Sequence, residues 1–155
     1  MASDIDAIIS DTIPKSFMRA VERWHNEPAI REKHMGVWKT VSWAEWLERS
    51  KAVAYALDAM DFKPGDVASI LCNTKPEWVY ADMGVLLAGG VSSGIYPTDS
   101  PRQVEYLVND SKTRVLFVED DEQLDKALEV RVRCPTLVKI VVFDMEGLTR
   151  FSDSM

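Results

Sequence analysis

Residues that could carry chemistry are few in this chain and stand apart from one another. A loop that binds phosphate needs small residues between a strand and a helix, and Gly84 and Gly89 come nearest to that spacing. Gly90 and Val91 stand where a lysine and a hydroxyl residue should follow. We therefore expect close packing at Gly84 and a left-handed helix cap at Gly89 in place of a phosphate loop.

The side chains suited to nucleophilic or metal chemistry are also scattered. A nucleophile needs a base within hydrogen-bond reach, and the two histidines, His25 and His34, are placed by no motif. We expect structural roles for them, at a helix end and at a hairpin tip. Cys72 and Cys134 lack the spacing of metal ligands and lie in or beside apolar segments, as buried thiols do. The tryptophans occupy helix or strand positions and are expected in core or subdomain contacts: Trp24, Trp38, Trp43, Trp46 and Trp78.

An acidic run closes one apolar segment. Val115–Val118 is followed directly by Glu119, Asp120 and Asp121, a pattern that resembles the strand and acidic cluster that hold Mg²⁺ in response-regulator receiver domains. In receivers the cluster ends the first strand, and the residues that remain after Asp121 are too few for the rest of such a domain. We favour the simpler role, in which Asp120 or Asp121 caps a helix that carries Leu124.

The elements that must position these residues alternate in type from residue 67 onward. Strands are predicted over Val67–Cys72, Val91–Tyr96, Val115–Val118 and Lys139–Phe143. The helices between them are predicted to start at Thr74 with Glu77, at Ser100 with Pro101 and Gln103, and at Asp120-Asp121. Such alternation requires right-handed crossovers, so the predicted fold class is α/β, with a partial doubly wound, mostly parallel sheet and flanking helices.

The first 66 residues predict helices and a hairpin in place of alternating strands and helices. A helix should open near Thr12 and stop at His25, two strand-like runs from residue 29 to 41 should form a hairpin, and Ser42 with Glu45 should cap a second helix. We expect one structural unit in two parts. Residues 1–66 are N-terminal helices and a hairpin that pack on the sheet, and residues 67–155 are an incomplete α/β subdomain. No helix is predicted after Phe143 to cover the sheet edge, so the sheet looks unfinished.

Composition narrows the classes of function. The 155 residues are 46% hydrophobic, enough for one compact core, and carry 25 acidic against 18 basic residues. The net charge of -7 disfavours nucleic acid, because the basic clusters, such as the run from Arg31 to Lys33, are short and mixed with acids. The paucity of cysteine and the acidic N-terminus predict a cytoplasmic protein. The most apolar stretch, Met83–Val91, is too short to span a bilayer, and peripheral contact with a membrane stays open.

Several segments in a fixed order carry a resemblance to a known family. They are Val41–Trp46, Lys63–Ala68, Asn73–Trp78, Ala88–Val91, Ile95–Pro101, Val104–Leu107, Asp110-Ser111, Arg114–Glu119, Leu128–Arg131 and Ile140–Val142. Together they resemble the start of the AMP-binding domain of the adenylate-forming superfamily, in its long-chain fatty acyl-CoA synthetase branch. Asp61 stands where that family commonly ends a helix with glycine, and Gly94 where it commonly has proline.

The resemblance implies a parent enzyme that makes an acyl-adenylate from a fatty acid and ATP and then transfers the acyl group to CoA. The family's loop that ends in lysine, its motifs for adenine, ribose and Mg²⁺, and the lysine of its mobile C-terminal domain are all expected beyond Met155. We therefore assign no catalytic, cofactor-binding or metal-binding residue in this chain. The chain alone is expected to bind no cofactor and to be inactive, with the remainder of the same polypeptide as its partner.

Two alternatives stay open at this stage. One is a receiver-like signalling module in which Glu119, Asp120 and Asp121 hold Mg²⁺. The other is a non-catalytic interaction domain, in which the uncovered sheet edge binds a partner or a second copy of the chain.

Overall fold

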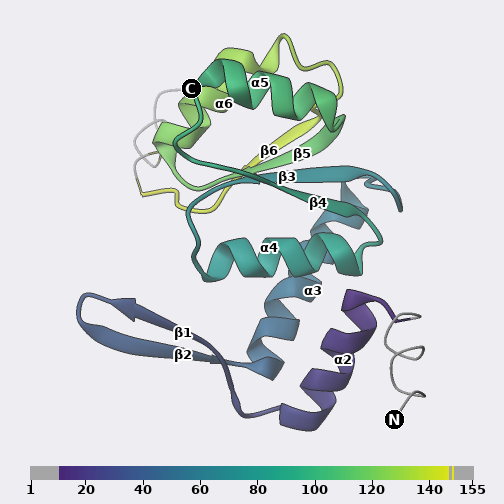
Figure 1. The fold of residues 1–155 in the computed structure, drawn as a ribbon, viewed down its shortest axis with the longest axis vertical. Helices are drawn as coiled ribbons and strands as arrows, with labels where there is room; N and C mark the ends of the chain where they lie inside the picture. Colours follow the sequence, from purple (N-terminus) through teal and green to yellow (C-terminus); the bar gives the residue numbers. More distant parts are fainter. Residues whose placement is uncertain (1–10, 147, 149–155) are drawn as a thin grey trace, which may run out of the picture.

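A computed structural model describes residues 11–146 and 148 of the chain (Figure 1). In chain order the elements are α2 (Ile13–Trp24), β1 (Pro28–His34), β2 (Val37–Ser42), α3 (Trp43–Ala59), β3 (Val67–Leu71), α4 (Pro76–Leu87), β4 (Val91–Ile95), α5 (Pro101–Asp110), β5 (Thr113–Val118), α6 (Asp121–Arg131) and β6 (Lys139–Val142). Four strands form a parallel sheet in the order β4-β3-β5-β6, and β1 and β2 form a separate antiparallel hairpin.

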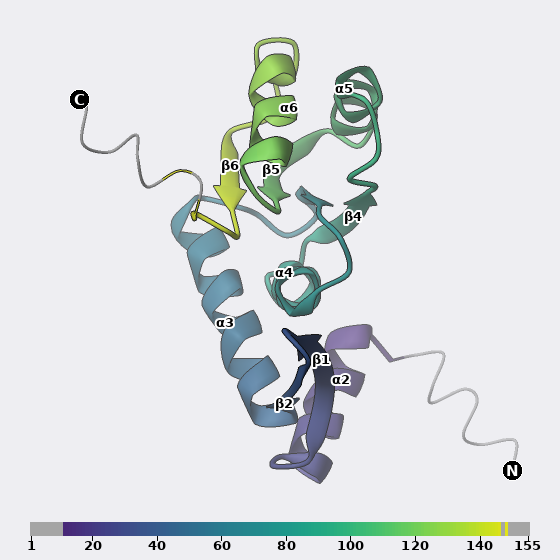
Figure 2. The ribbon, with the colours of Figure 1, turned by 90° about the vertical axis from the view of Figure 1, so that its left-hand side faces the viewer.

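Helices cover both faces of the parallel sheet (Figure 2). On one face α5 and α6 enclose a core that includes Leu71 and Leu116, and on the other α3 and α4 enclose a second core with Ile70 and Phe117. Because successive side chains of a strand point to opposite faces, β3 and β5 must be apolar on both, which explains their nearly continuous apolar sequences. The doubly wound α/β fold predicted from the sequence is confirmed.

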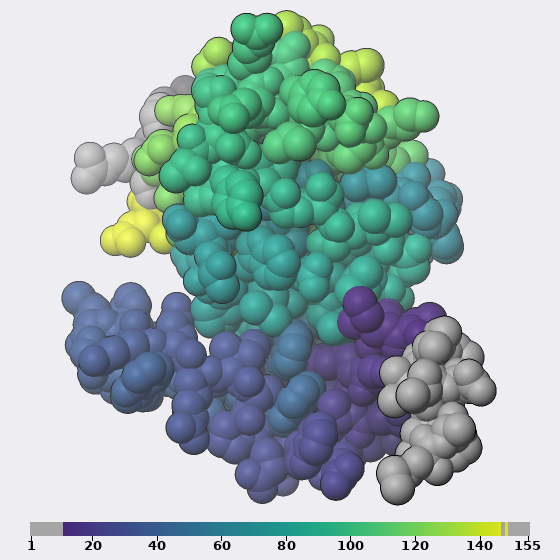
Figure 3. All heavy atoms as spheres, viewed as in Figure 1, coloured from purple at the N-terminus to yellow at the C-terminus, as the bar shows by residue number. Residues whose placement is uncertain are grey.

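The N-terminal elements form an arm below the sheet. α2 contacts α3 through rings, with Phe17 packed edge-on against Trp46 at 4.7 Å between centroids and Trp43 at 5.4 Å from Trp46. α3 is long enough to reach from this aromatic cluster to the sheet, where its Leu57 is fully buried. The hairpin extends sideways from the body in the space-filling view, where it is blue (Figure 3).

Most of the helix starts predicted from the sequence are confirmed. Ser42 and Glu45 form a reciprocal capping box at α3, as do Ser100 and Gln103 at α5. Asp120 caps α6 by accepting a hydrogen bond from the Gln123 backbone N–H at 3.1 Å.

The predicted start of α4 is wrong. The N-cap of α4 is Lys75, which makes no side-chain cap, and not Thr74. Pro76 has a φ already suited to the first helical position and no N–H to satisfy, so the helix starts there without a hydroxyl cap.

Three backbone positions are explained by the residue that occupies them. A Cβ on Gly84 would lie 2.6 Å from Cβ of Val53, so the glycine allows α3 and α4 to approach closely. Gly89 has a φ of +78° at the end of α4, and Asp61, which follows α3, has a φ of +61°. Both expected roles of Gly84 and Gly89 are confirmed. The sequence also predicted that no helix covers the sheet edge after Phe143. That part of the chain lies mainly outside the described residues, so the prediction stays open.

Candidate functional site

The order of the strands singles out one end of the sheet. From β3 the chain crosses to β4 on one side, and from β4 it returns past β3 to β5 on the other side. The crossover helices therefore diverge between β3 and β5, and in open α/β sheets ligands bind in the crevice at the carboxyl ends of the strands at such a switch point. The residues that follow β3, β4 and β5 are the ones to consider.

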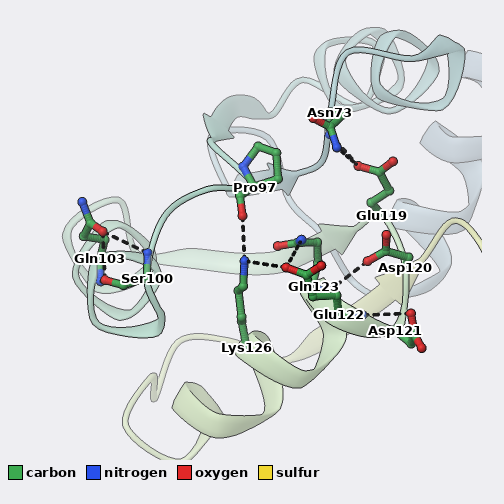
Figure 4. A network of polar contacts seen from close by, with 10 residues as sticks. All are labelled: Asn73, Pro97, Ser100, Gln103, Glu119, Asp120, Asp121, Glu122, Gln123 and Lys126. Atoms are coloured by element: carbon green, nitrogen blue, oxygen red, sulfur yellow. Dashed lines mark hydrogen bonds and ion pairs between the residues drawn. The ribbon is translucent and has the colours of Figure 1, made fainter.

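A polar network joins the ends of β3 and β5 (Figure 4). Glu119 Oε2 accepts hydrogen bonds from the backbone N–H of Asn73 at 2.7 Å and from Asn73 Nδ2 at 2.9 Å. Glu119 Oε1 lies 3.3 Å from Lys75 Nζ, in a half-buried ion pair. One carboxylate thus binds two residues of the loop after β3, which lie 46 and 44 positions before it in the sequence.

The electrostatics of this network favour its ionised form. Burial by itself would raise the pKa of Glu119, but the hydrogen bonds from Asn73 and the charge of Lys75 outweigh it, and the net pKa is lowered. For Lys75, burial opposes the charge while Glu119 restores it, and the pKa is raised. Burial, followed by the nearby Glu119 charge, raises the pKa of the Cys72 thiol to about 12, so this cysteine is a poor nucleophile.

The other two residues of the acidic run, Asp120 and Asp121, accept hydrogen bonds at the start of α6. Asp120 is the helix cap described above, as favoured from the sequence, and Asp121 accepts a hydrogen bond from the Glu122 backbone N–H. Across residues 11–146 and 148, histidine, cysteine and acidic side chains form no group of three that could hold a metal ion. The receiver-like arrangement is therefore not assembled in this part of the chain.

A second contact ties the loop after β4 to α6. Lys126 Nζ donates to the carbonyl oxygen of Pro97 at 2.7 Å and pairs with Glu122 at 3.3 Å (Figure 4). Beside this loop, between the ends of β3 and β4, lies a pocket of about 320 Å³. Its lining combines two aromatic rings with small and polar side chains: Cys72, Asn73, Thr74, Trp78, Gly94, Ile95, Tyr96 and Pro97.

The two histidines lie away from this end of the sheet, whereas Cys72 lines the pocket described above. His25 faces Asn26, with 2.9 Å between Nδ1 and Oδ1, and His34 is in the hairpin opposite Val37. Cys72 and Cys134 are both buried and free, as expected. A larger surface hollow of about 760 Å³ lies between α5 and α6, beside the ion pair of Arg133 and Glu105.

The tryptophans divide between two outcomes. Trp43 and Trp46 pack in the aromatic cluster of α2 and α3, and Trp78 packs against the core of the α3 and α4 face, as predicted. Trp38 contradicts the prediction because its side chain is 63% exposed on the hairpin. A two-stranded ribbon has no second layer, so a strand position there does not imply burial.

Sequence reasoning missed the network of Asn73, Lys75 and Glu119. The signal was available, since Asn73 and Glu119 directly follow strands that were correctly predicted and Lys75 lies in the same loop as Asn73. Parallel strands bring their carboxyl ends to one edge, so residues after neighbouring strands meet there. What was missing was the strand order, which decides that β5 and not β6 lies next to β3.

Solved structures with the same fold define the class of the protein. The anthranilate CoA ligase AuaEII, crystallised in complex with anthranoyl-AMP, superimposes with a TM-score of 0.74 at 25% identity, over 84% of this chain and 24% of that one. The coronafacic acid ligase from Pectobacterium brasiliense gives a TM-score of 0.77 at 20% identity, over 92% of this chain and 27% of that one. The fold is that of the adenylate-forming enzymes.

The sequence comparison identifies the family. The profile described as AMP-binding enzyme matches residues 17–154, and the chain belongs to this AMP-binding enzyme family. It is 33% identical over 131 residues to the long-chain-fatty-acid–CoA ligase ACSBG2 of Rattus norvegicus. It is 27% identical over 132 residues to the long-chain-fatty-acid–CoA ligase ACSBG1 of Rattus norvegicus.

These matches cover most of this chain but only a small part of each relative. They cover 84% and 85% of this chain but 20% and 18% of the two relatives, so the chain spans about a fifth of the length of the curated proteins that it matches. The family resemblance read from the sequence is confirmed, with the chain corresponding to a fraction of the relatives.

Proposed function

We propose that this chain is part of the AMP-binding domain of a long-chain fatty acid–CoA ligase, an enzyme that activates a fatty acid with ATP and passes the acyl group to CoA. The observation that carries the proposal is the family match over residues 17–154, on a fold shared with acid ligases. Curated relatives named as long-chain-fatty-acid–CoA ligases support the substrate class.

The described residues do not provide the groups that binding of ATP and Mg²⁺ requires. No glycine-rich loop stands between strand and helix in residues 11–146, and no metal-ligand group is found among the residues that the structure describes. At the switch point Lys75 is already paired with Glu119, and the acidic run beside it would repel phosphates. We therefore propose that this chain alone binds no cofactor and is inactive, and we route no catalytic step through its residues.

In this proposal the chain acts as scaffold. Residues 67–155 supply strands and covering helices of the sheet, and residues 1–66 supply the packing arm, for the remainder of a longer ligase polypeptide that provides the catalytic groups. Electrostatic stabilisation of acyl and phosphoryl transfer requires donors close to the reacting atoms. The network of Asn73, Lys75 and Glu119 has the simpler role of holding two strand ends together.

A cytoplasmic location is part of the same proposal. Both cysteines, Cys72 and Cys134, are unpaired and buried, which suits a reducing compartment. Within the described residues, no helix combines the length and the apolar character needed to cross a bilayer.

The decisive experiment captures the native protein from its cells with an antibody raised against this chain. The captured protein is supplied with a radiolabelled long-chain fatty acid, ATP, Mg²⁺ and CoA, and acyl-CoA is measured. We expect acyl-CoA from the native protein and no fatty-acid-dependent ATP–pyrophosphate exchange from the purified 155-residue chain. Intact native protein that forms neither acyl-adenylate nor acyl-CoA would refute the assignment.

The same purified chain also tests the signalling alternative. Incubation with acetyl phosphate should leave no acid-labile label. A label that forms and is lost in Asp120→Asn would instead establish the receiver-like reading, because the helix cap would then also be a phosphate acceptor.

A further inference from the structure

A chain of buried hydroxyl groups joins β3 to β5 and to the end of α5. Ser69 Oγ lies 2.5 Å from Thr113 Oγ1, and Thr113 Oγ1 lies 2.7 Å from Ser111 Oγ. Ser69 and Thr113 are both fully buried, although the strands that carry them are otherwise mostly apolar. Ser111 Oγ also lies 2.7 Å from the carbonyl oxygen of Leu107 in α5. We call Ser69, Thr113 and Ser111 the hydroxyl chain.

The direction of each hydrogen bond follows from the number of protons. A carbonyl oxygen only accepts, so Ser111 donates its single hydroxyl proton to Leu107. Thr113 then donates to Ser111, and Ser69 donates to Thr113. Each hydroxyl proton is used once, and Thr113 takes part in two of the bonds, so it is the central member of the hydroxyl chain.

The hydroxyl chain lies beside an irregularity in the pairing of β5. Val67 is opposite Thr113. The next residue of β3 is opposite Val115, so Arg114 is an extra residue, a bulge, in β5. Successive residues of β3 point to opposite faces of the sheet, and so do their partners. Thr113 therefore points toward α5, where it meets Ser111, and Val115 points into the core of α3 and α4.

The bulge and the hydroxyl chain depend on each other. Leu116 and Val118 point into the core of α5 and α6, on the same side as Thr113. In a regular strand, residues at odd and even positions point to opposite faces, so Thr113 could not share a face with Leu116 and Val118. It would then lie beyond the reach of Ser111. The bulge residue itself is held at the edge of the core, with Arg114 Nε at 3.3 Å from Asp66 Oδ2.

The apolar residues of β3 and β5 by themselves give only a weak preference for this register. Both strands are buried on both faces, so a shift by one residue exchanges one apolar face of β5 for the other. In a strand with one polar face, the same shift would bury polar side chains and expose apolar ones. A buried hydroxyl without a partner is costly, so a polar pair inside an apolar sheet favours the one register that satisfies it.

We propose that the hydroxyl chain locks the register of β5 against β3 and thereby assembles the candidate site at the switch point. In the observed register Leu71 is opposite Val118, and the backbone N–H of Glu119 donates to the carbonyl oxygen of Leu71 at 3.1 Å. The Glu119 carboxylate then reaches Asn73. If β5 were regular from Thr113 onward, Glu119 would move one position along β3 and its side chain would point to the opposite face. The lock acts on the geometry of this site, whatever reaction the site serves.

A double-mutant cycle in urea tests the direction of the hydrogen bonds. Thr113→Val keeps the shape of the side chain but leaves the buried Ser69 hydroxyl without an acceptor. The folding equilibrium constant should fall about thirtyfold, the equivalent of about 2 kcal/mol. Ser69→Ala removes only the first donor and should lower the constant about fivefold. The double variant should be no less stable than Thr113→Val, because its unpaired donor is gone. Losses that simply add would show independent hydroxyls and contradict the proposal.

Nuclear magnetic resonance reads the register. Nuclear Overhauser effects between backbone protons of β3 and β5 identify opposite residues, and one set is expected for the original chain and for Thr113→Ser, which keeps the hydroxyl. In Ser69→Ala/Thr113→Val we expect a second set of amide signals over residues 113–119. This set should be about a tenth as intense, for two registers that differ by about 1.4 kcal/mol, with its contacts shifted by one residue along β3. Thr40→Val, at an exposed position of β2, is the matched control and should give one set.

Three outcomes would overturn the proposal. The first is a single set of signals in the original register for the double variant. The second is a second register in Thr40→Val or Thr113→Ser, because the hydroxyl chain is intact in both. The third is a double variant that does not fold, because replacing both partners by apolar groups should leave a folded chain. If Thr113→Val alone does not fold, the double variant still decides, since it has no unpaired hydroxyl at position 69.

Discussion

Glu119→Ala is the substitution whose effect the structure specifies best. The carboxylate accepts two hydrogen bonds from Asn73, at 2.7 and 2.9 Å, and pairs with Lys75 at 3.3 Å. Its side chain is only 14% exposed. Truncation would leave the Asn73 backbone N–H and the Lys75 ammonium without these partners at the point where the ends of β3 and β5 meet.

The expected loss of stability follows from these contacts. A hydrogen bond to a charged group contributes about 1.5–3 kcal/mol, and a partly exposed ion pair adds at most about 1 kcal/mol. Asn73 is itself exposed, so water replaces part of what is lost. We expect a fall of about 2 kcal/mol in the free energy of unfolding, which corresponds to a fall of roughly 4–8 °C in Tm for a chain of this size.

Urea unfolding followed by circular dichroism measures this loss. Glu119→Gln keeps one oxygen for Asn73 but loses the charge that pairs with Lys75, so about half of the effect should remain. Glu122→Ala is the matched control, because the Glu122 side chain is 73% exposed and its ion pair with Lys126 should contribute less than about 0.5 kcal/mol. Equal losses for Glu119→Ala and Glu122→Ala, at unchanged denaturant dependence, would refute the view that Glu119 holds the strand ends together.

Three other predictions concern pH, packing and thiol chemistry. The pKa of Glu119 is lowered on folding, so its contribution to the free energy of unfolding is complete above the ordinary value of 4.5 and is lost as pH falls through the lower folded value. The free energy of unfolding of Glu119→Gln should therefore depend less steeply on pH in the acid range. Identical pH profiles for the two proteins would contradict this. Gly84→Ala should destabilise by about 1–3 kcal/mol in urea unfolding, because the new Cβ would lie 2.6 Å from Val53, whereas Gly94→Ala, with 3.6 Å of clearance, should cost less. With its pKa raised to about 12, Cys72 should react with a disulfide reagent at pH 8 only as fast as the protein unfolds, and rapid labelling of the folded chain would contradict this.

Local sequence patterns decided much of the fold. The reciprocal caps at Ser42 and Ser100 were predictable because the interacting groups are three residues apart and need no other part of the chain. The central strands β3 and β5 were predictable because burial on both faces requires nearly continuous apolar runs. Where a cap was predicted wrongly, at Thr74, the rigid ring of Pro76 set the helix start instead.

The candidate site was less accessible to sequence reasoning. The capping role of Asp120 depends on a residue three positions away and was correctly predicted. The partners of Glu119 lie 44 and 46 positions away in the chain. Their contact depends on β5 lying beside β3, and the spacing of elements does not specify strand order.

By itself the sequence determined the class of fold, the family and most of the places where helices begin, because these depend on residue type and near neighbours. Tertiary structure decided which carboxylate joins which strand end and which charges share a face. Arg31, Glu32 and Lys33 illustrate the difference. In sequence they form one run of mixed charge, but in the strand Glu32 points to the opposite face from Arg31 and Lys33. Electrostatic and hydrogen-bonding interactions act through distances in space, and these distances exist only once the chain has folded.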